Sequence, residues 1–154
     1  CSFFFCCTGI DKARRLRSKE CRRGHETGEK IGKNIDEFCK YLPNINVVTV
    51  YGGANIDEQI RGLKKGAQIV VGTPGRTVDL IKRKQLKLQD IKWVVLDEAD
   101  EMLNMGFKEE LDQILEVTPK QKQTLLFSAT FRFNVLNLFF TYPKESPPFK
   151  FGID

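Results

Sequence analysis

Three carboxylates follow an apolar run closely enough to share one site. The run is Trp93–Leu96, and the acidic residues are Asp97, Glu98 and Asp100. An uninterrupted apolar run is typical of a strand covered on both faces, as in a parallel sheet flanked by helices. Acidic groups at the carboxyl end of such a strand usually face a metal ion, a nucleotide or an attacking water. The alternative is a helix N-terminus whose dipole stabilises acidic side chains, but that alternative does not explain the buried strand.

Three other segments of unusual composition also follow strand-like runs. They are Gly52-Gly53 after residues 47–51, Thr73–Arg76 after residues 69–71, and Ser128–Thr130 after residues 124–127. Glycine allows close approach of another backbone, and arginine forms bidentate bonds to phosphate. Each segment taken alone is equally well explained as an ordinary turn or strand end.

The elements that position these segments alternate between strand and helix. Ile31, Ile35, Phe38 and Leu42 recur at helical spacing before Pro43. Further helices are expected between Asn55 and Gly66, around Val78–Ile81, and over Phe107–Leu115. Strict alternation predicts right-handed crossovers and a parallel sheet flanked by helices, an α/β fold. All strands of such a sheet end at one edge, so we expect the four segments to face one crevice that handles phosphate.

The totals describe an ordinary globular domain. The chain has 154 residues, of which 41% are hydrophobic and 29% charged, and no apolar run is long enough to span a bilayer. Five cysteines without a C-x-x-C pair argue against both a disulfide framework and a zinc site. We therefore expect free thiols and a cytoplasmic protein.

The basic excess is confined to the start of the chain. Residues 1–33 hold nine Lys or Arg and four Asp or Glu, whereas residues 34–154 hold sixteen of each. A basic arm that binds phosphate and a solvated charged surface without a partner both explain this distribution.

Five motifs in order resemble those of the DEAD-box RNA helicases, most closely the first RecA-like domain of the bacterial members. They are Tyr51-Gly52-Gly53, Thr73-Pro74-Gly75-Arg76, Asp97-Glu98-Ala99-Asp100, Met105-Gly106-Phe107 and Ser128-Ala129-Thr130. The resemblance covers residues 29–130. It implies that residues 1–154 form part of a RecA-like domain of the P-loop NTPase type. It also implies an ATP-dependent RNA helicase, in which RNA-stimulated ATP hydrolysis is coupled to local duplex unwinding.

The resemblance implies specific roles for the acidic residues. Asp97 would hold the Mg²⁺ of MgATP through water, and Glu98 would orient or deprotonate the water that attacks the terminal phosphate. Asp100 would meet Ser128, Ala129 and Thr130 and couple ATP binding to RNA unwinding.

RNA contacts are implied for the other two strand ends. Gly52, Gly53, Thr73, Pro74, Gly75 and Arg76 would touch the RNA backbone, which positions the strand without reading its sequence. Met105 and Phe107 are expected to belong to the core instead.

The sequence also departs from the family pattern. It contains no G-x-x-x-x-G-K-[ST] phosphate loop and no adenine-recognising segment, and the second RecA-like domain is absent from this chain. We therefore expect the chain alone to be inactive as an ATPase.

The two ends of the chain fit the family poorly. Residues 3–6 are the expected first strand, but the atypical basic segment 8–28 lacks the family motif there, which we interpret as a reading-frame slip. Residues 131–154 are expected to form an irregular tail.

Two alternatives to the helicase remain. One is a non-enzymatic remnant that binds RNA, and the other is a metal-dependent phosphohydrolase that uses Asp97, Glu98 and Asp100 alone. The single histidine, His25, lies in the atypical segment and is not placed to support the second alternative. The expected partner is RNA, with no membrane association and a monomeric state.

Overall fold

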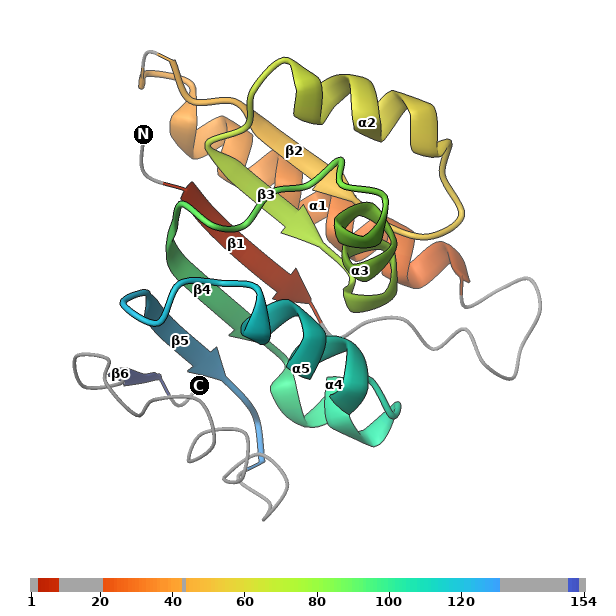
Figure 1. Cartoon of the computed structure of the whole chain (residues 1–154), viewed down its shortest axis with the longest axis vertical. Helices are drawn as coiled ribbons and strands as arrows, with labels where there is room; N and C mark the ends of the chain where they lie inside the picture. Colours follow the sequence, from red (N-terminus) through yellow and green to blue (C-terminus); the bar gives the residue numbers. More distant parts are fainter. Residues whose placement is uncertain (1–2, 9–20, 43, 131–149, 153–154) are drawn as a thin grey trace.

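One parallel sheet runs through the part of the chain that the structure describes (Figure 1). The computed structural model describes residues 3–8, 21–42, 44–130 and 150–152, with side chains for residues 30–42 and 44–130. The strand order is β2-β3-β1-β4-β5-β6, and every neighbouring pair is parallel. The strands are β1 (Phe3–Thr8), β2 (Val47–Val50), β3 (Ile69–Gly72), β4 (Ile91–Asp97), β5 (Gln123–Phe127) and β6 (Lys150–Gly152).

Helices cover both faces of this sheet, giving three layers. Figure 1 shows α1 behind the sheet and α2, α3 and α5 in front of it, with α4 beyond the end of β4. The helices are α1 (Cys21–Cys39), α2 (Ile56–Lys64), α3 (Pro74–Lys82), α4 (Ala99–Asn104) and α5 (Lys108–Glu116). None of the helices in the described residues is long and apolar enough to cross a membrane.

The central part of β3 and the second half of β4 are buried on both faces, which explains their uninterrupted apolar runs. Val70 belongs to the larger core under α2, α3 and α5, whereas its neighbour Val71 packs with Val95, Ile31 and Ile35 on the α1 side. Side chains of consecutive strand residues point to opposite faces, so a run of valines packs into the cores on both sides of the sheet.

Local signals in the sequence set the boundaries of α2. The Asn55 side chain accepts a hydrogen bond from the Asp57 N–H (2.9 Å), which caps the first turn. Asp57 and Glu58 lie in the first turn and Arg61 and Lys64 in the last, as the helix dipole favours. Gly66 follows with φ of 90°, a left-handed conformation suited to glycine.

The expected strands are all present, and their ends shift by at most two residues. The first strand extends to Thr8 and lies between β3 and β4, with Phe5 in register with both Val70 and Val94. The fold class predicted from the sequence is therefore confirmed.

Two expectations at the edges of the domain are wrong. The helix before β2 begins at Cys21, ten residues earlier than the apolar spacing indicated. The helix also ends at Cys39, before Leu42, which was expected to lie on it, and Phe38 is 83% and Leu42 57% exposed. In the described part of the sheet β2 is the outermost strand, so the last turn of α1, which packs on β2 and β3, has no further strand there to cover.

The tail contains a strand that the sequence did not indicate. Lys150–Gly152 forms β6 beside β5, so this part of the expected irregular tail is regular. Residues 131–149, where an apolar stretch was noted, and residues 9–20 of the atypical segment lie outside the described residues. The other expectations for segment 8–28 stay predictions. Among the cysteines whose side chains are described, Cys39 is a free thiol.

Candidate functional site

The four unusual segments lie at one edge of the sheet, in two pairs. Gly52-Gly53 and Thr73–Arg76 follow the adjacent strands β2 and β3, and the acidic motif and Ser128–Thr130 follow the adjacent strands β4 and β5. Strand β1 separates the pairs, so β3 and β4 are two strand spacings apart, roughly 10 Å. The shared edge was predicted. The division into two neighbouring sites was not, because strand order cannot be read from the alternation alone.

A strained backbone turn presents the acidic motif. Asp97 is the last residue of β4, and Glu98 has φ of 54° and ψ of 46°, in the left-handed region. The Glu98 N–H donates to the Asp97 Oδ1 at 3.0 Å. A residue other than glycine in this region costs on the order of 1 kcal/mol and is found preferentially at functional sites. The turn ends the strand and starts α4 at Ala99.

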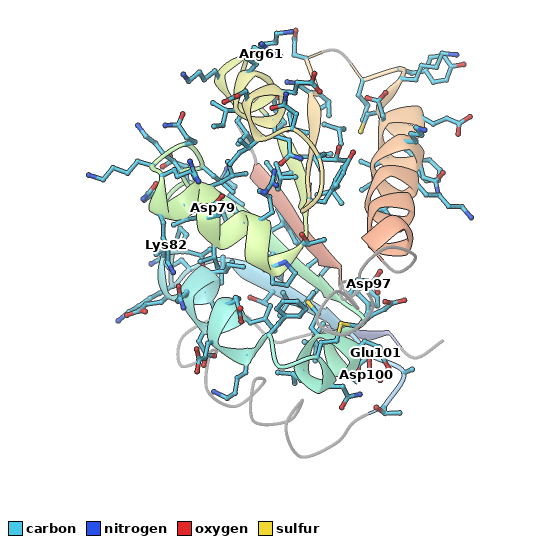
Figure 2. All side chains as sticks on the ribbon, turned by 90° about the vertical axis from the view of Figure 1, so that its right-hand side faces the viewer. Arg61, Asp79, Lys82, Asp97, Asp100 and Glu101 are labelled. Atoms are coloured by element: carbon cyan, nitrogen blue, oxygen red, sulfur yellow. The ribbon has the colours of Figure 1, made fainter. Side chains whose placement is uncertain are left out.

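The environment of Glu98 makes it a better proton acceptor than an ordinary carboxylate. Its pKa is raised, first by burial and then by the negative charges of Asp97, Glu101 and Asp100. Figure 2 shows Asp97, Asp100 and Glu101 gathered at one end of the molecule, apart from Arg61, Asp79 and Lys82. A general base works best with a pKa moved towards neutral pH, and the shift of Glu98 has that direction.

The carboxylates do not converge as a metal cage. No group of three His, Cys, Asp or Glu side chains in the described residues could hold a metal ion. This finding counts against a self-sufficient metal site at Asp97, Glu98 and Asp100. Mg²⁺ in nucleotide sites is commonly held by one or two carboxylates, waters and substrate phosphates. A single carboxylate at Asp97 fits that donor set.

Asp100 and Thr130 join the ends of β4 and β5. The Asp100 Oδ2 accepts hydrogen bonds from the Thr130 N–H (3.0 Å) and the Thr130 Oγ1 (2.7 Å). A hydrogen bond from the Ser128 side chain helps to lower the pKa of Asp100, as expected, and the Ser128 Oγ also lies 2.8 Å from the Thr130 carbonyl oxygen.

The hydrogen bonds around Asp100 also determine the direction of its pKa shift. Burial alone would raise the pKa of this carboxyl, which is 7% exposed. The hydrogen bond from Thr130, the nearby Ser128 hydroxyl and the backbone N–H groups of Glu101 and Thr130 outweigh burial and lower the pKa. The pKa of Asp100 is therefore shifted in the opposite direction to that of Glu98.

The loops that follow β2 and β3 border open space, in contrast to the cluster of carboxylates that follows β4. A Cβ added to Gly52 or Gly75 would meet no atom within 4 Å, so both glycines border open space. Gly53 has φ of 86°, which a side chain would resist. Gly72 has the opposite environment, because a Cβ there would lie 2.6 Å from the Thr77 Oγ1 and 2.7 Å from the Val50 Cγ2. The two strand ends thus pack tightly together beneath an accessible glycine surface.

Arg76 bonds to the neighbouring loop. Its Nη1 donates to the Gln59 Oε1 (2.9 Å), and both Nη1 and Nη2 donate to the Ala54 carbonyl (3.3 Å each). The Gln59 Nε2 in turn donates to the Tyr51 carbonyl (3.1 Å). Gln59 was not predicted from the sequence as a site residue. Its only signal was a polar side chain on the face of α2 that carries Ile56, Ile60 and Leu63.

The segment after the acidic motif was expected to belong to the core. Phe107 packs against the larger core, as expected, whereas Met105 is half-buried at the end of α4. Gly106 lies between them with φ of 84° and ends the helix.

Comparison with known proteins identifies the family. Residues 25–138 match the model of the DEAD/DEAH box helicase family. This chain belongs to the DEAD/DEAH box helicases. Two similar relatives are the DEAD-box ATP-dependent RNA helicase CshA of Streptococcus pneumoniae and the RNA helicase CrhR of Synechocystis. CshA is 64% identical over 86 residues, and CrhR is 51% identical over 105 residues.

The match extends to solved DEAD-box structures. A DEAD box protein from the hyperthermophile Methanococcus jannaschii superposes with a TM-score of 0.78 at 38% identity, over 96% of this chain and 36% of that chain. The matched regions are 56% of this chain and 16% of CshA, and 68% of this chain and 21% of CrhR. The RecA-like α/β fold is thus shown, over a small part of the length of these DEAD-box relatives.

Proposed function

We propose that this chain carries RNA-binding and ATP-hydrolysing residues of an ATP-dependent RNA helicase. In such an enzyme, RNA-stimulated ATP hydrolysis is coupled to local unwinding of a duplex. One observation carries the proposal. Accessible glycines follow the carboxyl ends of β2 and β3, on the same side of the sheet as the carboxylates at the carboxyl end of β4. A strand of RNA and a nucleotide could therefore lie side by side on one rigid sheet.

The β2–β3 end is the proposed RNA-binding site. Gly52 and Gly75 leave room for a sugar-phosphate backbone, and Thr73 is the N-cap residue at the start of α3, whose first turn contains Pro74, Gly75 and Arg76. The first N–H groups of a helix have no partner within the helix, and its dipole favours an anion there. Pro74 occupies the first turn without losing a needed donor. Contacts of this kind hold phosphates independently of base sequence.

The β4–β5 end is the proposed catalytic site. Asp97 would hold the Mg²⁺ of MgATP through water, and the ion would neutralise charge on the phosphates. Glu98, with its raised pKa, would orient the attacking water and accept its proton. Asp100, bonded to Thr130, would couple the catalytic site to the end of β5. A movement of one strand end would then shift the other through these hydrogen bonds.

ATP turnover is not proposed for these 154 residues alone. They contain no G-x-x-x-x-G-K-[ST] loop to cradle the phosphates, and the second RecA-like domain expected from the family is not among them. RNA binding without nucleotide turnover is the second candidate function, supported by the open space at Gly52 and Gly75. Its signature is salt-sensitive RNA binding that does not respond to nucleotide.

Calorimetry and RNA titration test the proposal together. The purified chain is titrated with MgATP beside a variant carrying Asp97→Ala and Glu98→Ala, and a labelled single-stranded oligouridine is titrated at several salt concentrations. We expect salt-dependent RNA binding and no detectable MgATP binding. MgATP binding that the double variant loses would overturn the expected inactivity. Failure to bind RNA at low salt would overturn the RNA role.

A further inference from the structure

Gln59 connects the two halves of the proposed RNA site. It lies on α2, is only 7% exposed, and uses both ends of its amide. The Nε2 donates to the Tyr51 carbonyl just before Gly52, and the Oε1 accepts from Arg76 in the first turn of α3. A buried amide is costly unless its groups are bonded, and this orientation bonds an oxygen and a nitrogen at once.

Arg76 completes the connection from the other side. Both terminal nitrogens of its guanidinium donate to the Ala54 carbonyl, on the far side of the two glycines from Tyr51. Gln59 and Arg76 therefore hold the chain on both sides of Gly52-Gly53. Ala54 occupies the guanidinium edge formed by Nη1 and Nη2, one of the two edges with which an arginine can form two parallel bonds to a phosphate.

We propose that Gln59 is a positioning residue for RNA binding. Together with Arg76 it fixes the loop 51–54 against the start of α3, so that backbone N–H groups of both segments meet the phosphates of one strand. In this arrangement Arg76 acts through its hydrogen bonds to Ala54 and Gln59, and not by direct contact with a phosphate. The inference rests on the proposed RNA-binding function.

The salt dependence of RNA binding separates positioning from direct contact. Each phosphate neutralised by a Lys or Arg adds about 0.7 to the slope of log affinity against log salt for single strands. Loss of a phosphate-binding arginine therefore flattens this slope. Loss of a positioning residue lowers the affinity and leaves the slope as it was, because no cation leaves the interface.

The closing experiment measures oligouridine affinity by fluorescence anisotropy across a salt series. The variants are Gln59→Met, Arg76→Met, the double variant and the control Gln68→Met. Gln68 accepts from the Asn46 N–H (2.8 Å) before β2, at the opposite edge of the sheet, so the control removes a comparable bond away from the site. Circular dichroism confirms that each variant is folded at the assay temperature. Gln59→Glu, which still accepts from Arg76 but cannot donate to Tyr51, is the second variant if Gln59→Met fails to fold.

We expect Gln59→Met to bind RNA roughly tenfold more weakly with an unchanged salt slope, and Gln68→Met to bind as the wild type. Arg76→Met should show the same loss and the same slope, and the double variant no greater loss. Wild-type affinity in Gln59→Met, or a flatter slope in Arg76→Met, would overturn this inference while the RNA-binding function stands. A wild-type chain that binds no RNA overturns the proposed function and this inference with it.

Discussion

The bond between Asp100 and Thr130 gives the sharpest quantitative expectation, through the substitution Asp100→Asn. The Asp100 Oδ2 accepts two hydrogen bonds from Thr130, and the carboxylate accepts another from the Glu101 N–H. Asparagine has nearly the same shape but only one oxygen acceptor. Its NH₂ group must therefore face one of these donors.

The expected cost of Asp100→Asn is about 2 kcal/mol of unfolding free energy. A hydrogen bond to a charged group contributes roughly 1.5–3 kcal/mol, and we take the lower part of this range because Thr130 is exposed to solvent. Thr130→Val, the matched partner variant, keeps the N–H bond and removes only the hydroxyl, so it should cost about 1 kcal/mol. The double variant should cost less than the sum of the two singles, because both remove the same bond.

The difference in unfolding free energy between wild type and Asp100→Asn should depend on pH in a direction that the pKa of Asp100 sets. Because the folded pKa of Asp100 lies below its ordinary value of 3.8, its stabilisation is present above pH 3.8 and is lost as the pH falls through the folded pKa. Urea unfolding from pH 7 downwards measures the difference between wild type and Asp100→Asn. The difference should be constant above pH 3.8 and shrink below it. Equal stability at pH 7, or a difference that does not change in acid, would refute the reasoning.

Three further predictions concern stability and are measured by the same urea unfolding. Glu98→Gln removes a carboxylate whose pKa is raised, so it should stabilise the fold by about 0.5 kcal/mol at pH 7, with the gain vanishing below the ordinary pKa of 4.5. Gly72→Ala should cost about 2 kcal/mol, because its Cβ would crowd Thr77 and Val50, whereas Gly52→Ala should change stability by less than about 0.5 kcal/mol. Lys122 is 4% exposed with a pKa lowered by burial, so Lys122→Met should stabilise the fold by about 1 kcal/mol at pH 7. That last gain should fade as the pH rises and vanish above the ordinary pKa of 10.5, where the lysine is neutral in both states.

The parts of the fold that follow from local chemistry were predictable from the sequence. Apolar β-branched runs and helical spacing identified β2 to β5 and the helices α2, α3 and α5, but not α4, and Asn55 marked the start of α2 because capping is local. The alternation of these elements gave the parallel sheet and the shared edge of the site.

The rest depends on contacts between distant segments. The order of the strands, which separates the glycine pair from the acidic pair, is set by packing and leaves no local signal. The exposure of Phe38 follows from the position of β2 at the sheet edge. The bonds of Gln59 to Tyr51 and Arg76 join three segments, and a glutamine in a helix carries no mark of such partners.

The most direct test of the account is a titration of the isotopically labelled chain with single-stranded oligouridine, followed by NMR amide shifts. The central claim is that the ends of β2 and β3 form the RNA-binding surface. It predicts that the largest shifts occur at Gly52, Gly53, Gly75 and Arg76, with little change at Gln68 on the opposite edge. Largest shifts on the basic stretch 82–87, with Gly52 and Gly75 unmoved, would contradict the claim.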